Sequence, residues 1–154
     1  VQHMPKGFTT SFAKRLDMIS NIRVVEAEDN MKIHGNMIYL APGDYHMYIK
    51  GDKIRLSHRA KLYGVRPAVD YLFESAAQRY AHRLLGILLT GMGRDGAKGM
   101  KVIKDMGGYN IAQSEETCVV YGMPGNAVEK GVVDIILGLE EISTNLNKLL
   151  KVEQ

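Results

Sequence analysis

Hydrophobic and polar positions along the chain alternate between the spacings of helices and of strands. Phe8, Phe12, Leu16 and Ile19 recur at helical spacing. The unbroken apolar run from Leu84 to Leu89 is typical of a parallel strand covered on both faces. The patterns predict helices over residues 8–20, 67–80, 97–106, 124–130 and 139–150, and strands over residues 22–25, 36–41, 45–50, 53–57, 84–90, 109–113 and 132–136.

The order of these segments predicts an α/β fold. Strands that alternate with helices favour a doubly wound, mostly parallel sheet with helices on both faces. Gly51-Asp52 separates two short apolar segments, which is a hairpin signal, so we expect a small antiparallel hairpin at one edge. Pro67 suits the first turn of the helix that follows it.

Composition narrows the class of protein. The 154 residues suit one domain with one core, and 45% apolar and 24% charged residues are ordinary for a globular protein. No apolar run approaches the roughly 18 residues of a membrane span. The single cysteine, Cys118, excludes a disulfide framework and favours a cytoplasmic location. A net charge of +3 argues against nucleic-acid binding.

The loop Gly91-Met-Gly-Arg-Asp-Gly96 follows the central strand, where open α/β sheets bind ligands. Its glycine spacing fits a dinucleotide fingerprint, but Asp95 would then repel phosphates at the helix N-terminus. Asp95 could instead orient a catalytic histidine, with the glycines admitting backbone N–H groups to an oxyanion. A third interpretation is that Asp95 only caps its own helix.

His3 is the natural partner for Asp95, because it follows the end of an apparent strand and would lie at the same sheet edge. A surface histidine is the alternative. His46 could line the same cleft. The remaining histidines show no metal-ligand spacing, so no zinc site is expected.

Six motifs, taken in order, resemble the C-terminal catalytic domain of chemotaxis receptor protein-glutamate methylesterases, the CheB family. The resemblance covers essentially the whole chain, from Val1 to about Ile142. The motifs are Val1-Gln-His-Met-Pro-Lys-Gly-Phe-Thr9, Tyr39-Leu-Ala-Pro-Gly-Asp44, Arg66-Pro-Ala-Val-Asp-Tyr-Leu-Phe73, Leu89-Thr-Gly-Met-Gly-Arg-Asp-Gly-Ala97, Ile111-Ala-Gln113 and Gly122-Met-Pro124.

The resemblance implies a cytoplasmic serine hydrolase that demethylates glutamate methyl esters, and deamidates glutamines, on the cytoplasmic helices of chemoreceptors. It implies that His3 is the general base, Asp95 the triad acid and the Met92 N–H an oxyanion donor. No metal or organic cofactor is implied. Family members often carry an N-terminal receiver domain of a two-component system, and no membrane insertion is expected.

The chain departs from the family at the nucleophile. No segment matches the serine-threonine-glycine-glycine turn of the family, and Ser11, the serine nearest to His3, lies in a predicted helix. We therefore expect residues 1–154 to be a methylesterase domain that lacks its first strand-helix unit, and expect this fragment to be inactive. The alternatives are a non-catalytic receptor-binding relative, a nucleotide-binding Rossmann-type domain, and a site that uses Cys118 as nucleophile.

Overall fold

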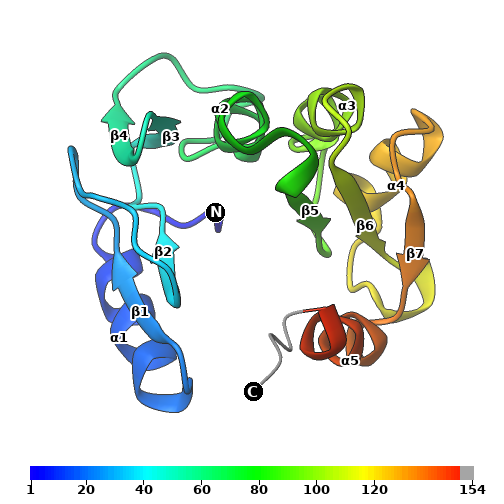
Figure 1. Ribbon diagram of the computed structural model, residues 1–154, viewed down its shortest axis with the longest axis horizontal. Helices are drawn as coiled ribbons and strands as arrows, with labels where there is room; N and C mark the ends of the chain where they lie inside the picture. The colour runs from blue at the N-terminus through cyan, green and yellow to red at the C-terminus, as the bar shows by residue number, and fades with distance from the viewer. Residues whose placement is uncertain (150–154) are drawn as a thin grey trace.

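The computed structural model describes residues 1–149, which form a mixed arrangement of parallel strands, helices and one hairpin (Figure 1). No helix within these residues has both the length and the apolar character needed to cross a membrane. In chain order the elements are α1 (Phe8–Ile19), β1 (Arg23–Glu26), β2 (Met37–Leu40), β3 (His46–Lys50), β4 (Lys53–Ser57), α2 (Val69–Tyr80), the 3-10 helix η1 (Ala81–Arg83), β5 (Leu85–Leu88), α3 (Ala97–Asp105), β6 (Tyr109–Gln113), the 3-10 helix η2 (Glu115–Thr117), α4 (Gly122–Glu129), β7 (Ile135–Leu137) and α5 (Leu139–Leu149).

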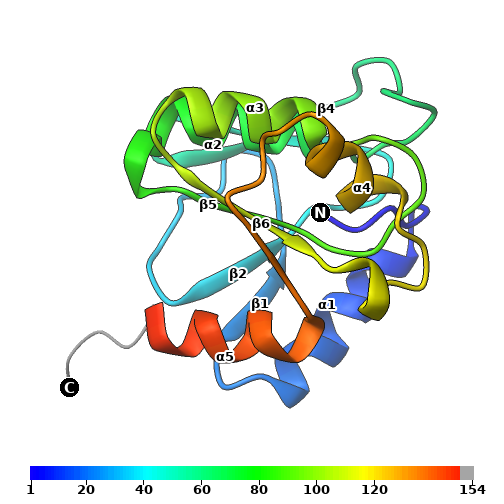
Figure 2. The same ribbon diagram turned by 90° about the vertical axis from the view of Figure 1, so that its right-hand side faces the viewer.

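The parallel strands form two groups, which lie on opposite sides of the molecule in Figure 1. One group pairs β1 with β2, and the other pairs β5, β6 and β7 in that order. Helices α3 and α4 cover one face of the second group and α5 covers the other (Figure 2). The predicted hairpin, β3 and β4, forms a separate antiparallel sheet against α2. The α/β class predicted from the alternating pattern is therefore observed.

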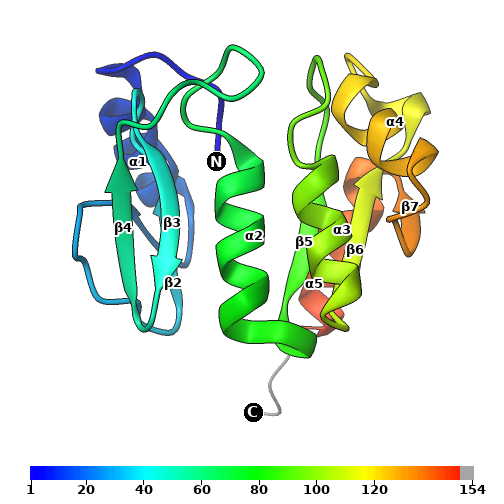
Figure 3. The same cartoon turned by 90° about the horizontal axis from the view of Figure 1, so that it is seen from above.

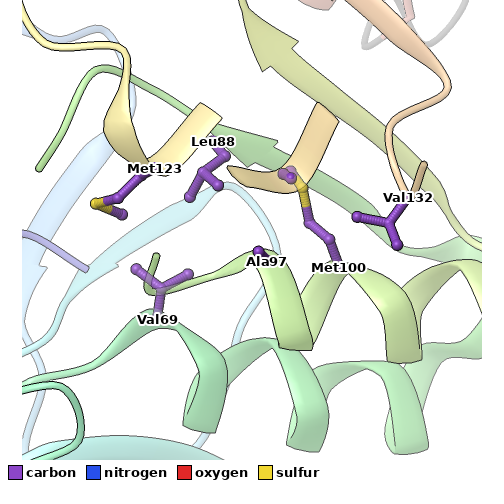
Figure 4. Packing of buried hydrophobic residues seen from close by; sticks show 7 residues of the cluster. Val69, Leu88, Ala97, Met100, Met123 and Val132 are labelled. Atoms are coloured by element: carbon purple, nitrogen blue, oxygen red, sulfur yellow. The ribbon is translucent and has the colours of Figure 1, made fainter. Parts of the chain in front are cut away.

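The largest hydrophobic cluster joins α2, β5, α3 and α4 (Figure 4). Met100 of α3 is fully buried in it, and Leu88 of β5 is almost so. A second cluster lies around Met47 of the hairpin. Val1 packs against both clusters, because the N-terminal segment runs between the two groups of strands (Figure 3). The loop after β5 is thus brought close to the first residues of the chain.

The N-terminal turn is held by a close backbone contact. A Cβ atom on Gly43 would lie 2.5 Å from the carbonyl carbon of Pro5 and 2.6 Å from the nitrogen of Lys6. The Gly43 N–H also donates to Thr9 Oγ1 at 2.9 Å, and that hydroxyl donates to Glu26 at 2.5 Å. Only a residue without a side chain can occupy position 43 without moving the turn that carries His3.

Three predicted boundaries were wrong for reasons that involve distant residues. Helix α2 begins two residues after Pro67, where Asp95 accepts the first N–H groups of the helix. Helix α4 begins at Gly122 instead of residue 124, because the Met123 N–H already donates to Gly91 O. Strand β7 begins at Ile135 instead of residue 132, since Val132 is buried in the core cluster.

The central strand also differs from its prediction. In β5 only Gly86 and Leu88 are buried, whereas Leu85 and Ile87 are partly exposed. Within residues 1–149 coverage on both faces is not observed, and Ile87 lines a cavity. The predicted end of the last helix, Leu150, lies outside the described residues.

We predict that Gly43→Ala lowers the free energy of unfolding by about 1–3 kcal/mol, because the new methyl group must displace backbone atoms. Urea denaturation at neutral pH would measure it. Gly35→Ala is the matched control, since nothing lies within 4 Å of its Cβ position. That variant should change the stability by less than about 0.5 kcal/mol. Equal effects of the two substitutions would contradict the steric explanation.

Candidate active site

His3 and Asp95 meet at the carboxyl end of β5, as the sequence analysis predicted. His3 Nε2 lies 2.7 Å from Asp95 Oδ2, although the two residues are 92 positions apart. The His3 side chain is 24% exposed and that of Asp95 is 2% exposed. The pair therefore has one buried partner and one that reaches solvent, which is the arrangement needed to exchange a proton with a bound molecule.

Asp95 is also bound by the backbone of a neighbouring helix. Its Oδ2 accepts the N–H of Val69 at 2.6 Å, and its Oδ1 accepts the N–H of Asp70 at 3.0 Å. Asp95 thus caps α2. The alternative that Asp95 only caps its own helix, α3, is wrong. The carboxylate binds the first N–H groups of α2, while the Gly96 N–H at the start of α3 donates to Asp70 instead.

These contacts favour the ionised form of Asp95. Burial would raise the pKa of this carboxyl, but hydrogen bonds from His3, Val69 and Asp70 together hold that pKa below its ordinary value. An ionised carboxylate only accepts hydrogen bonds. His3 Nε2 must therefore donate to Asp95, and Nδ1 is left as the basic nitrogen of the ring.

A cavity of about 680 Å³ opens beside His3. It is bounded by the N-terminal residues, by the loop after β5 and by the partly exposed face of β5. His3, Met92 and Tyr63 line it, and Met123 closes one side. A cavity of this size can hold an extended side chain and its neighbouring atoms.

Met92 lies in the loop between β5 and Asp95. Its side chain is 83% exposed, and its N–H makes no hydrogen bond with other atoms of residues 1–149. The residues on either side of it are held in place: the Gly91 N–H donates to Val120 O, Gly91 O accepts the Met123 N–H, and Gly93 O accepts the Asn126 side-chain amide. A free N–H in a loop that lines the same cavity as His3 is suited to binding an oxyanion.

Two residues that were not predicted as site residues hold this loop through hydrogen bonds. Gln113 is 1% exposed, and its side-chain oxygen accepts the Thr90 N–H at 2.8 Å. Asp70 is 1% exposed and accepts the N–H groups of Gly96 and Gly99. An acidic residue in the first turn of a predicted helix was the available signal for Asp70. Nothing in the sequence indicated that it would bind a different helix.

Residues 1–146 match the family model described as CheB methylesterase. The chain belongs to the CheB methylesterase family.

Solved and curated relatives resemble the chain closely. The crystal structure of the Thermotoga maritima CheB methylesterase catalytic domain superposes with a TM-score of 0.91 at 42% identity, covering 97% of this chain and 81% of that one. The protein-glutamate methylesterase/protein-glutamine glutaminase of Pyrococcus abyssi is 51% identical over 92% of this chain and 40% of its own length. A Pseudomonas aeruginosa protein of that name, numbered 2, is 49% identical over 94% and 43%. The chain thus spans less than half the length of these curated relatives.

Membership of the CheB methylesterase family leaves little support for the dinucleotide alternative. A phosphate would need the N–H groups at the start of α3. Two of these, on Gly96 and Gly99, already donate to the Asp70 carboxylate. Within residues 1–149, moreover, no group of three or more histidine, cysteine, aspartate or glutamate side chains could hold a metal ion.

No serine or cysteine of residues 1–149 forms a hydrogen bond with the His3 side chain, whose partner is Asp95. Ser11 lies in α1, and its hydroxyl donates to Phe8 O at 3.0 Å. Cys118 does not line the cavity, and burial raises the pKa of its thiol, which disfavours the reactive thiolate. Cys118 is therefore a poor candidate for the nucleophile.

His46 does not line the cavity and has a structural position instead. It is fully buried, where Nε2 donates to Ala60 O at 3.0 Å and Nδ1 accepts the Ala68 N–H at 3.2 Å. The suggestion that His46 lines the cleft was wrong, because both ring nitrogens bind the segment that leads into α2. Burial lowers the pKa of His46, which agrees with a neutral ring.

We predict that the free energy of unfolding decreases as the pH falls from 7.5 to 5. The folded pKa of His46 is depressed, so its contribution is complete above its ordinary pKa of about 6.5 and is lost as protonation of Nδ1 expels the Ala68 N–H. Asp95 also has a depressed pKa, but its contribution is lost only at lower pH, below about 3.8.

Urea denaturation at several pH values would measure this dependence. His46→Gln should flatten the slope between pH 7.5 and 5, at a cost of about 1–3 kcal/mol at neutral pH. His34→Gln is the control, because the His34 residue is exposed, and it should keep the wild-type slope. An unchanged slope in the His46 variant would show that another group causes the pH dependence.

Proposed function

We propose that the protein containing this chain is a serine hydrolase that removes methyl groups from glutamate methyl esters of chemoreceptors and also deamidates glutamines. The observation that carries the proposal is the 2.7 Å contact between His3 and the buried Asp95 beside an open cavity. The names of the curated relatives, protein-glutamate methylesterase/protein-glutamine glutaminase, support the choice of reaction.

In this proposal His3 is the general base. Its Nδ1 takes the proton of a serine hydroxyl as the serine oxygen attacks the ester carbonyl carbon. Asp95 holds the Nε2–H and stabilises the imidazolium that forms. Because no serine of the described residues contacts His3, and because the relatives are longer than this chain, we assign the serine to a part of the protein outside residues 1–154.

The Met92 N–H is proposed to stabilise the oxyanion of the tetrahedral intermediate. Collapse of that intermediate breaks the bond to the methoxy group, which leaves as methanol with the proton from His3; a glutamine substrate would release ammonia. Water then attacks the acyl-enzyme, with His3 again as base, and regenerates the serine. Every step uses protein groups alone, so no metal or organic cofactor is invoked.

The partner is proposed to be the cytoplasmic helices of methyl-accepting receptors, which places the reaction in the cytoplasm. One feature of the cavity edge suits an acidic helix. The Arg94 guanidinium lies over the Tyr63 ring, 4.8 Å from its centroid, beside the cavity that Tyr63 lines. Regulation by a receiver domain elsewhere in the protein belongs to the same proposal.

We expect Asp95→Asn to lower turnover by about 10⁴-fold, because the amide would hold the His3 ring in the wrong tautomer. His3→Ala should lower turnover at least as far. The measurement is methanol release from methylated receptor membranes by the longer protein. Asp52→Asn, in the exposed turn of the hairpin, and His34→Ala should keep wild-type rates.

Two outcomes would decide against the proposal. Turnover of Asp95→Asn close to that of the wild type would remove Asp95 from the mechanism. No methanol release by a folded wild-type protein that contains the serine would instead favour the alternative of a receptor-binding relative without chemistry.

A further inference from the structure

Asp70 is a buried acidic side chain to which the proposed chemistry gives no role. It is the second residue of α2 and is 1% exposed. Its Oδ1 accepts two backbone N–H groups from the start of α3, those of Gly96 at 3.0 Å and Gly99 at 2.7 Å. Asp70 therefore caps a helix other than its own.

Asp70 and Asp95 cap each other's helices. Asp95 in the loop before α3 accepts the first two N–H groups of α2, one of which is the N–H of Asp70 itself. Asp70 in turn accepts the N–H of Gly96, which belongs to the peptide unit directly after Asp95. The hydrogen bond from Gly96 thus fixes the backbone of Asp95, while α2 fixes its side chain.

The two helices lie unusually close where this exchange takes place. A Cβ atom on Gly99 would lie 2.4 Å from Phe73 Cβ, so only glycine allows α3 to approach α2 at this point. The short Asp70 side chain spans the remaining distance to α3. A displacement of Asp70 would therefore be transmitted to the turn that carries Asp95.

The environment of Asp70 is costly for a carboxylate. Its Oδ2 is buried and has no hydrogen-bond partner among residues 1–149. Burial raises the pKa of Asp70 and the nearby Asp95 carboxylate raises it further, while the N–H groups of Gly99 and Gly96 lower it. The two N–H groups at the start of α3 therefore hold the Asp70 side chain in this buried position.

We propose that Asp70 is a positioning residue for the His3–Asp95 pair: through its hydrogen bonds to Gly96 and Gly99 it fixes the turn from which Asp95 reaches His3. This inference rests on the proposed function for its kinetic consequence. Its structural consequence, the geometry of the His3–Asp95 hydrogen bond, does not depend on turnover.

The kinetic test compares Asp70→Ala with Asp70→Asn in the longer protein. Asp70→Ala removes both hydrogen bonds, and a shift of Asp95 by about 1 Å should lower kcat by about 100-fold. KM should change by less than about twofold, because Asp70 does not line the cavity. Asp70→Asn keeps an oxygen that can accept both N–H groups and should retain kcat within about threefold.

The control variant is Glu74→Gln. Glu74 lies on the same helix, and its carboxylate pairs with Lys98 of α3 at 2.9 Å, so the substitution weakens the α2–α3 contact without touching Gly96. It should leave kcat and KM unchanged. A loss of kcat in this variant equal to that in Asp70→Ala would mean that general loosening of the helix pair, and not Asp70, controls turnover.

The second measurement is the NMR signal of the His3 ring proton that is donated to Asp95, which needs no turnover and is recorded on the longer protein. The low-field signal should be present in the wild type, Asp70→Asn and Glu74→Gln, and absent or broadened in Asp70→Ala. If Asp70→Ala does not fold, Asp70→Ser takes its place. The serine hydroxyl can accept only part of the hydrogen bonds that Asp70 accepts from Gly96 and Gly99.

A folded Asp70→Ala or Asp70→Ser variant that keeps both the signal and wild-type kcat would overturn the proposal. So would an Asp70→Asn variant that loses as much kcat as Asp70→Ala, since the acceptor oxygen is then not the cause. If the signal behaves as expected but the wild-type protein with its serine releases no methanol, the positioning role holds and the proposed function fails.

Discussion

The structure depends on one buried carboxylate that needs hydrogen-bond donors. Asp95 is 2% exposed, and three groups supply it with N–H donors: the His3 ring and the first two backbone N–H groups of α2. These donors come from the N-terminal segment and from a helix that begins 26 residues earlier than Asp95. Removing a charge from water is costly unless donors replace the lost solvent. The hydrogen bonds that meet this requirement therefore link three segments that are distant in the sequence, and they keep the carboxylate ionised.

An ionised Asp95 fixes the chemistry of the neighbouring ring. Since a carboxylate cannot donate, the shared proton belongs to His3 Nε2, and Nδ1 is free to act as a base. The positive end of α2 contributes to the same effect, because a negative charge is stabilised at a helix N-terminus. The Asp95 charge is thus balanced by the scaffold before any substrate binds, which is a form of preorganisation.

Local patterns predicted the elements well, and distant contacts explain most of the errors. The helix over 8–20 and the strand over 109–113 follow from spacing alone, and both are observed within one residue. The meeting of His3 and Asp95 was also predictable, because both follow strand-like segments whose carboxyl ends share one sheet edge. That Asp95 caps α2 and Asp70 caps α3 was not predictable, because the helix that each residue binds depends on the packing of the two helices. The start of α4 likewise depends on Gly91, about 30 residues away.

The loop between β5 and α3 shows why a glycine pattern alone does not identify a ligand. Its spacing is compatible with a phosphate at the N-terminus of α3, and the backbone N–H groups needed for one are present. Two of them, on Gly96 and Gly99, already donate to the Asp70 side chain. The anion site is therefore filled by the protein itself. The Met92 N–H makes no hydrogen bond within residues 1–149, and Met92 lies in the part of the loop that lines the cavity with His3. A backbone N–H donor at this place is suited to an oxyanion that forms only during the reaction.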